Sequence, residues 1–122
     1  EIDIQDKEYR YKSTINLISA VPIMSAWILN FILDKEFQEP EKDKSIAENF
    51  VNMAFPELSK EQKEMSAKAM DLIFLLHADH EQNASTSTVR LSGSSETSPY
   101  AAIAAVYRLY GGQHMVGQMK QL

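Results

Sequence analysis

The sequence predicts an all-α protein, for three reasons. Apolar residues recur at the three- and four-residue spacing of helices, two stretches open with a helix N-terminal pattern, and no stretch alternates between apolar and polar residues as a strand would. At 122 residues the chain is one domain or part of one. We interpret residues 1–122 as a single partial domain, with a connecting segment at 1–12 and helices within 13–122.

The first helix is expected to begin after Ser13, an N-cap residue type, and to run to about Asp34. Residues 1–12 are mostly charged, which is why we assign them to a connection. Pro22 should kink the helix or mark a second start, because proline cannot donate a backbone hydrogen bond. From Ile23 to Leu33 nearly every residue is apolar, which favours burial on several sides, in a large core or an oligomer interface.

Two further helices should follow the charged loop from Lys35 to Lys44. Ser45 with Glu48 forms a capping-box pattern that opens a short helix ending near Phe55, and Ser59 with Gln62 repeats the pattern. On the helix after Ser59, one set of residues follows the spacing of a single buried face. Its members are Ser66, Met70, Ile73, Phe74 and His77. We therefore expect His77 on the apolar side, at the helix end.

Serine and threonine dominate residues 83–98, which predicts a flexible linker, although Val89 and Leu91 favour some order. Pro99 then stands where a first-turn proline belongs, at the start of an alanine-rich helix. Gly111 and Gly112 should end that helix. Its many small residues permit close helix packing.

Composition and charge exclude several classes of function. The net charge of −5 gives no basic surface for nucleic acid or an anionic membrane. The absence of cysteine removes disulfides and thiol catalysis and fits a reducing interior, so we expect a cytoplasmic protein. The charged stretch 1–11 lacks the apolar core of a signal peptide. The apolar stretch 19–33 is too short to span a bilayer, so we expect a buried helix and no membrane partner.

The segment 75–90 is the strongest candidate for a functional site. It holds two histidines, two carboxylates and four hydroxyls directly after an apolar helix. His77 and His80 are three residues apart, so at a helix end they could share a face and bind an anionic or carbonyl substrate. The structural alternatives are a hydrogen-bonded core histidine at 77 and a capping residue at 80.

His114 is the third histidine of the chain and follows Gly111 and Gly112. A neutral imidazole there could donate a hydrogen bond to a developing enolate oxygen; alternatively, it caps a helix C-terminus. A metal site is a further alternative, because His77, Asp79 and His80 offer two ligand types in four residues. No second ligand cluster follows, and Asp79 should point away from the two histidines, so we expect no metal.

The run from Leu76 to Arg90 closely resembles the central motif of bacterial-type citrate and methylcitrate synthases. Segments 93–95, 99–105 and 110–111 continue the resemblance in register, as do 18–24 and 45–50 upstream, so that it covers about residues 15–114. It implies an all-helical piece of the large domain of such an enzyme, without the small domain. Members of this family form homodimers and condense acetyl-CoA, or a related acyl-CoA, with oxaloacetate to give citrate in the tricarboxylic acid cycle, without a metal or cofactor.

The resemblance also implies roles for individual residues. His80 corresponds to the histidine that binds oxaloacetate, and His114 to the catalytic histidine that bonds the thioester oxygen as the enol forms. His77, Asn83 and Ser85 would belong to the supporting shell that orients these imidazoles.

The sequence departs from the family's pattern in two respects that bear on catalysis. Met115 and Val116 stand where the family has glycines, which should obstruct acyl-CoA beside His114. No Asp or Glu follows Glu96, so the family's proton-abstracting aspartate has no counterpart in these residues, and neither do its oxaloacetate-binding arginines. We therefore expect the 122 residues alone to be inactive. The alternative function is a non-catalytic, citrate-synthase-like dimerisation module or a decayed homologue.

Overall fold

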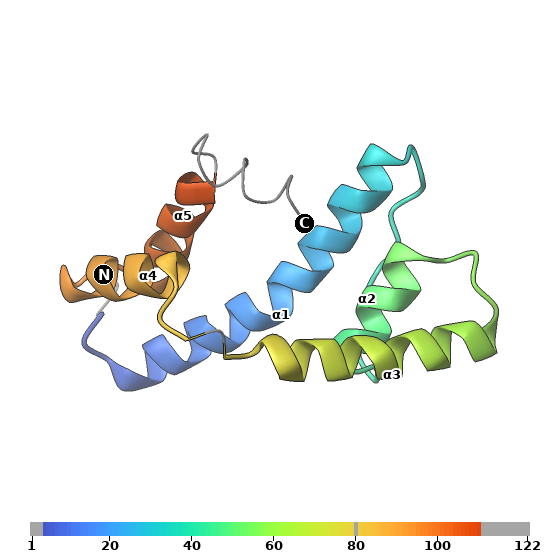
Figure 1. Cartoon of the computed structure of the whole chain (residues 1–122), viewed down its shortest axis with the longest axis horizontal. Helices are drawn as coiled ribbons and strands as arrows, with labels where there is room; N and C mark the ends of the chain where they lie inside the picture. Colours follow the sequence, from blue (N-terminus) through green and yellow to red (C-terminus); the bar gives the residue numbers. More distant parts are fainter. Residues whose placement is uncertain (1–3, 80, 111–122) are drawn as a thin grey trace. The chain divides into compact units, whose positions relative to one another are not determined.

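The computed structural model describes residues 4–79 and 81–110, and within them the predicted all-α class is confirmed. No strand occurs in these two ranges. The helices are α1 (Lys7–Ile32), α2 (Ile46–Ala54), α3 (Lys60–His77), α4 (Ala84–Ser94) and α5 (Pro99–Tyr110) (Figure 1). The chain divides into two compact units, one holding residues 16–79 and the other holding 4–15 and 81–110.

Helix α1 begins at Lys7, seven residues before the start predicted after Ser13. Asp6 caps it, because its Oδ1 accepts the backbone N–H of Glu8 at 2.9 Å and its carbonyl accepts that of Arg10 at 3.1 Å. Ser13 is buried inside the helix instead, so its predicted role as the N-cap is wrong. The helix continues through Pro22 without a second start.

The C-terminus of α1 is closed by a backbone motif around Asp34. Lys35 donates its N–H to the carbonyl of Asn30 at 2.8 Å, and Asp34 donates its own to Phe31 at 3.3 Å. Asp34 takes the left-handed conformation, with φ of 53°. These are the two bonds and the one left-handed residue of a Schellman motif, which satisfies carbonyls that the helix end leaves open.

The outer face of α1 is more exposed than predicted. The exposed fraction is 58% for Ile28, 76% for Phe31 and 70% for Ile32, so burial on several sides within the core of this chain is wrong, whereas burial in an oligomer interface stays a prediction. Residues 19–33 alone were expected to be too short to span a bilayer, but they are part of a longer helix. At 26 residues, α1 has the length and hydropathy of a helix that can cross a membrane, as do core helices of soluble proteins.

The core of residues 16–79 forms where the C-terminal half of α1 meets α2. Ala26 and Ala54 are fully buried there with Met53. The apolar side chains packed against them are Ile23, Trp27, Leu29, Phe50 and Phe55. Asn30 is also fully buried, and its Nδ2 donates to the carbonyl of Met53 at 2.9 Å. This bond serves a carbonyl in the last turn of α2, which has no partner within the helix.

Both predicted capping boxes are confirmed. The Ser45 N–H donates to Oε2 of Glu48 at 2.7 Å, while the Glu48 N–H donates to Oγ of Ser45 at 3.2 Å. Ser59 and Gln62 form the same reciprocal pair at 2.9 and 3.3 Å. Each box satisfies two backbone N–H donors at its helix start, which fixes where α2 and α3 begin.

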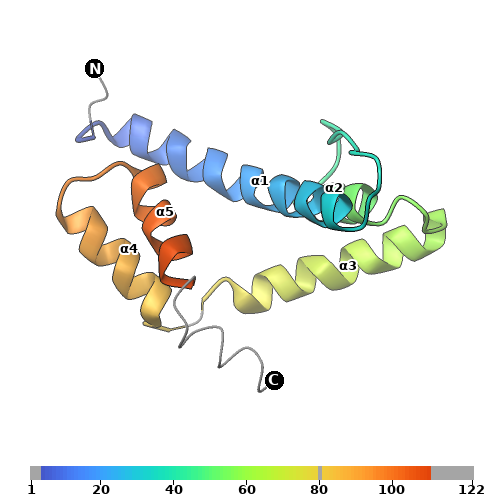
Figure 2. The same ribbon diagram turned by 90° about the horizontal axis from the view of Figure 1, so that it is seen from above.

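The buried face of α3 is narrower than its sequence spacing predicts. Helix α2 packs against α3 (Figure 2), and Phe50 meets Phe74 edge to face with ring centroids 6.3 Å apart. Ala67 is the buried residue of α3, whereas Ile73 and His77 are exposed, so the predicted apolar position of His77 is wrong. Nine-residue α2 spans only about 14 Å, against about 27 Å for α3, and cannot cover both ends.

In the other unit, the predicted flexible linker is a helix, α4, which packs against α5. Pro99 is the first residue of α5, as predicted, and Oγ of Ser98 accepts the Ala101 N–H at 3.2 Å. Ala102 is buried, consistent with close packing by small residues. The predicted stop at Gly111 and Gly112 lies outside the described residues.

Candidate functional site

The histidine-containing segment connects the end of α3 to the start of α4. His77 is the last residue of α3, and its side chain is exposed. Its Nδ1 lies 2.9 Å from the carbonyl of Ile73. A carbonyl only accepts, so Nδ1 carries the proton of this bond and the neutral ring presents Nε2 as an acceptor. His77 is therefore not a buried core histidine. In its neutral form, Nε2 can accept a hydrogen bond but cannot donate one.

The backbone turns sharply within this segment. Glu81 takes the left-handed conformation, with φ of 56°. Such a conformation is costly for a residue other than glycine and is often found near functional sites. Oγ1 of Thr86 lies 3.5 Å from the Glu81 carbonyl, a long hydrogen bond from the first turn of α4. The turn after position 80 is thus tied to the helix that follows it.

Asn83 is the N-cap of α4. Its Oδ1 accepts the Thr86 N–H at 2.9 Å, and its carbonyl accepts the Ser87 N–H at 2.9 Å. Because the oxygen is used for capping, the side-chain amide has a fixed orientation and its NH₂ group remains the donor for other contacts. Ser85 lies half-buried in the first turn of the same helix. The sequence offered the signal for this helix, an asparagine before a helical turn, but we interpreted the composition as a linker.

His80 and His114 both lie outside the described residues. The hypothesis that their imidazoles share one cavity therefore stays a prediction. His77 belongs to the unit of residues 16–79, whereas Asn83 and Ser85 belong to the other unit. Among the residues that the structure does describe, no three potential metal ligands lie together.

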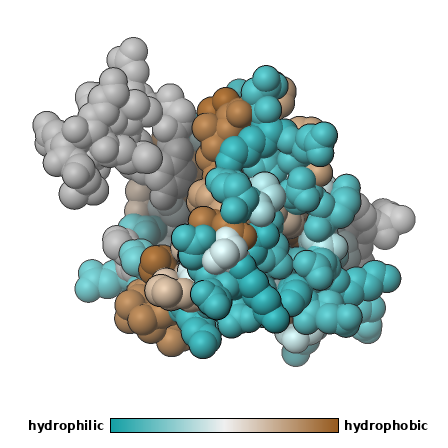
Figure 3. Space-filling model, turned by 90° about the vertical axis from the view of Figure 1, so that its right-hand side faces the viewer, coloured by the Kyte–Doolittle hydropathy of each residue, from teal (hydrophilic) through white to brown (hydrophobic). Residues whose placement is uncertain are grey.

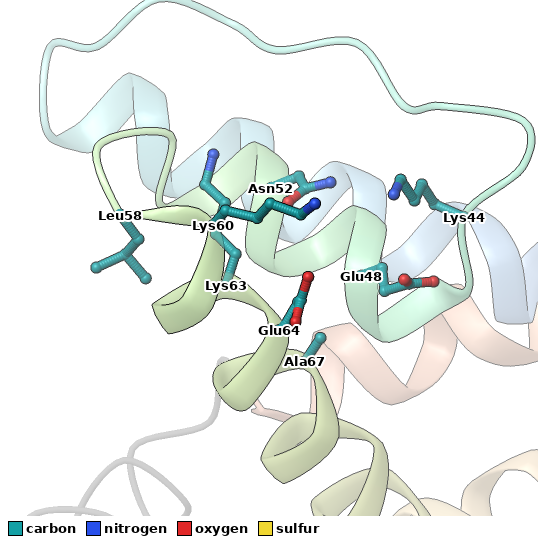
Figure 4. Close-up of a pocket in the computed structure, with 8 residues that line it drawn as sticks. All are labelled: Lys44, Glu48, Asn52, Leu58, Lys60, Lys63, Glu64 and Ala67. Atoms are coloured by element: carbon teal, nitrogen blue, oxygen red, sulfur yellow. The ribbon is translucent and has the colours of Figure 1, made fainter.

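A pocket that the sequence did not predict lies between α2 and α3 (Figure 4). Its volume is about 260 Å³. The residues that line it are Lys44, Glu48, Asn52, Leu58, Lys60, Lys63, Glu64 and Ala67. His77, the histidine that lies within the described residues, does not line it. Sequence reasoning missed these lysines because they are spread over a loop and the first turn of α3, and only the packing of α2 on α3 brings them together.

The chain matches a known protein family. Residues 1–120 match the family described as "Citrate synthase, C-terminal domain". The match covers nearly all of the chain and extends beyond the range 15–114 over which the motifs resemble the family. It also agrees with the all-α architecture and with the sequence around the α3–α4 connection. The chain belongs to the citrate synthase family.

Proposed function

We propose that this chain carries part of the active site of a citrate synthase-type acyltransferase, which condenses acetyl-CoA or a related acyl-CoA with oxaloacetate in the cytoplasm. The observation that supports this most is the family match over residues 1–120, together with the intact run from His77 to Arg90. The α3–α4 connection adds a turn directly after position 80, with Glu81 left-handed and Asn83 capping α4.

In this proposal, the imidazole of His80 hydrogen-bonds oxaloacetate, and that of His114 donates to the thioester oxygen as a base removes a proton from the acyl carbon. The enol carbon then attacks the keto carbon of oxaloacetate, and hydrolysis of the thioester releases CoA. A donor aimed at the oxygen where charge develops lowers the barrier more than one that binds the ground state. No Asp or Glu follows Glu96 in these 122 residues, so the base must come from elsewhere.

Asn83 is the described residue best suited to support His80. Its Oδ1 is held by the Thr86 N–H, so its NH₂ group has a fixed direction from which it can donate. An aspartate at this position would keep the capping oxygen and lose the donor. The two roles can therefore be separated by one substitution.

The test is oxaloacetate binding to the 122-residue chain, measured by calorimetry. We expect His80→Ala to weaken binding by roughly tenfold or more, the usual loss for a hydrogen bond to a charged group. Asn83→Asp should weaken it while preserving helicity. Thr88→Ala is the matched control, because its Oγ1 bonds the carbonyl of Ala84 within α4, at 2.7 Å. Equal binding by wild type and His80→Ala would contradict the proposed role of His80.

A second candidate function is a non-catalytic module that acts by association. Exposed apolar side chains on α1 and α3 favour it, among them Phe31 at 76% and Leu75 at 72%. The two functions are separated by oxaloacetate binding, which the module would lack. We expect no CoA release from the 122 residues with acetyl-CoA and oxaloacetate under either function, and turnover would contradict the need for an added base.

A further inference from the structure

Three lysines line the pocket between α2 and α3. Lys44 approaches it from the residue before the α2 cap, and Lys60 and Lys63 come from α3 (Figure 4). In the part of the chain that the structure describes, the ion pairs are Lys12–Glu8 and Lys35–Glu57. None of the three pocket lysines therefore has a carboxylate at ion-pair distance there.

Two carboxylates also face the pocket, and they offset the lysines only in part. Glu48 is committed to the capping box, where its Oε2 accepts the Ser45 N–H at 2.7 Å. That backbone hydrogen bond is the main cause of the lowered pKa of Glu48, and the nearby charge of Lys44 adds to it. With Glu64 as the other acid, the lining has a net charge of +1 in a chain of net charge −5.

The chemistry of the lining favours a phosphoryl group over a carboxylate. Lysine ammonium groups are compact point charges that bind phosphate oxygens, and three of them favour a phosphoryl group, which carries about −1.5 to −2 charge at neutral pH, over a carboxylate with a single charge. Lys60 is also the first residue of α3, where the helix dipole adds positive potential. The buried Ala67 and the half-buried Leu58 leave about 260 Å³, room for a small molecule.

We propose that the pocket between α2 and α3 binds the phosphoryl group of a small molecule through Lys44, Lys60 and Lys63. Its lysines lie on the loop before α2 and on the first turn of α3, near a surface that is mostly hydrophilic (Figure 3). The site lies within residues 16–79 and shares no residue with the histidine segment. The proposal for this pocket therefore does not rest on the proposed condensation.

The test is a titration of the ¹⁵N-labelled 122-residue chain with inorganic pyrophosphate at low salt, followed by amide chemical shifts. We expect saturable shifts at Lys60, Lys63 and Asn52. The double variant Lys60→Gln/Lys63→Gln should weaken binding by roughly tenfold or more, from the loss of two nearby charges. Glu64→Gln should strengthen it, because one repulsive charge is removed.

The control Lys7→Gln/Lys12→Gln makes the same change in net charge at two lysines of α1 that do not line the pocket. It should leave the affinity for pyrophosphate within about twofold, because distant surface charges are screened. Equal weakening by both double variants, or shifts that never saturate, would overturn the site. Citrate is the second ligand to titrate, and binding as tight as that of pyrophosphate would overturn the preference for phosphoryl groups.

Discussion

Asn30 joins two helices of residues 16–79 through a single buried hydrogen bond. Its side chain is fully buried, and Nδ2 donates to the Met53 carbonyl at 2.9 Å. Oδ1 of the same amide is buried and has no partner in the described structure. Asn30 therefore stabilises the fold through its Nδ2 hydrogen bond and destabilises it through its Oδ1, because a buried acceptor without a partner is unfavourable. In the sequence it was visible only as a polar interruption of an apolar stretch.

We expect Asn30→Ala to lower the free energy of unfolding by about 1–3 kcal/mol, because the Met53 carbonyl loses its donor. Asn30→Leu should recover part of this loss by removing the unpaired oxygen and filling the space. Urea denaturation measures both. The control is Ser25→Ala, whose exposed hydroxyl bonds only the Val21 carbonyl of its own helix, and whose effect should stay within about 0.5 kcal/mol. Equal losses at positions 25 and 30 would contradict the role of Asn30.

The capping box of α2 should depend on pH through Glu48. The backbone hydrogen bond from Ser45, followed by the bond to the Ser45 side chain, lowers the pKa of this carboxyl. A carboxyl with a lowered pKa in the folded state stabilises that state at neutral pH, and the contribution is lost as the pH falls through its folded pKa. The Ser45 amide shift should therefore titrate at a pH below the ordinary pKa of glutamate.

Glu48→Gln keeps a hydrogen-bond acceptor at the same position and removes the charge. In this variant the acid titration of the Ser45 amide should disappear, while the box itself persists. Glu64→Gln is the control, because Glu64 lies outside the box and its loss should leave the Ser45 titration intact. A Ser45 titration that survives Glu48→Gln would show that another group is responsible.

At the scale of the helices, the end of α1 carries strain that can be relieved. Asp34 occupies the left-handed position of the Schellman motif, where glycine has no steric cost. We expect Asp34→Gly to raise the free energy of unfolding by about 0.5–1 kcal/mol. Glu36→Gly, two residues further along in the loop and without a positive φ, should give no gain. Thermal unfolding followed by circular dichroism compares them, and equal effects would contradict the assignment of strain.

The helices also show where sequence reasoning succeeds and where it fails. The starts of α2, α3 and α5 were predicted because local signals, two capping boxes and a first-turn proline, decide them. Helix α4 was missed because serine and threonine have modest helix propensity, and its stability comes from the Asn83 cap and from packing on α5. We predicted too wide a buried face for α3, because the sequence does not show that the helix packed against it is the short α2.

At the scale of the whole molecule, the exposed apolar residues of α1 predict association. Ile28 and Phe31 are 58% and 76% exposed. Neighbouring exposed apolar side chains of this size are typical of surfaces that bind another protein. We expect the chain to self-associate, as homodimers of its family do, and Ile28→Glu/Phe31→Glu to reduce this in sedimentation experiments. Met65→Glu, at a residue 70% exposed on α3, is the control and should leave association unchanged.

The family could be predicted from the sequence because the run from His77 to Arg90 is long and specific, whereas the geometry of the site could not. The roles of His80 and His114 depend on how distant segments meet, which no local pattern specifies. The pocket between α2 and α3 shows the same limit, because its lysines were visible only as surface charges in the sequence.

The contact between Trp27 and the loop after α1 supplies a built-in optical probe. The indole Nε1 donates to the Gln38 carbonyl at 2.8 Å, and the ring lies 6.4 Å from that of Phe37. Trp27 is the sole tryptophan of the chain, so its emission reports melting of residues 16–79 alone, while far-ultraviolet ellipticity averages over every helix. Two melting curves that fail to superimpose would reveal that the halves of the polypeptide lose their order one after the other.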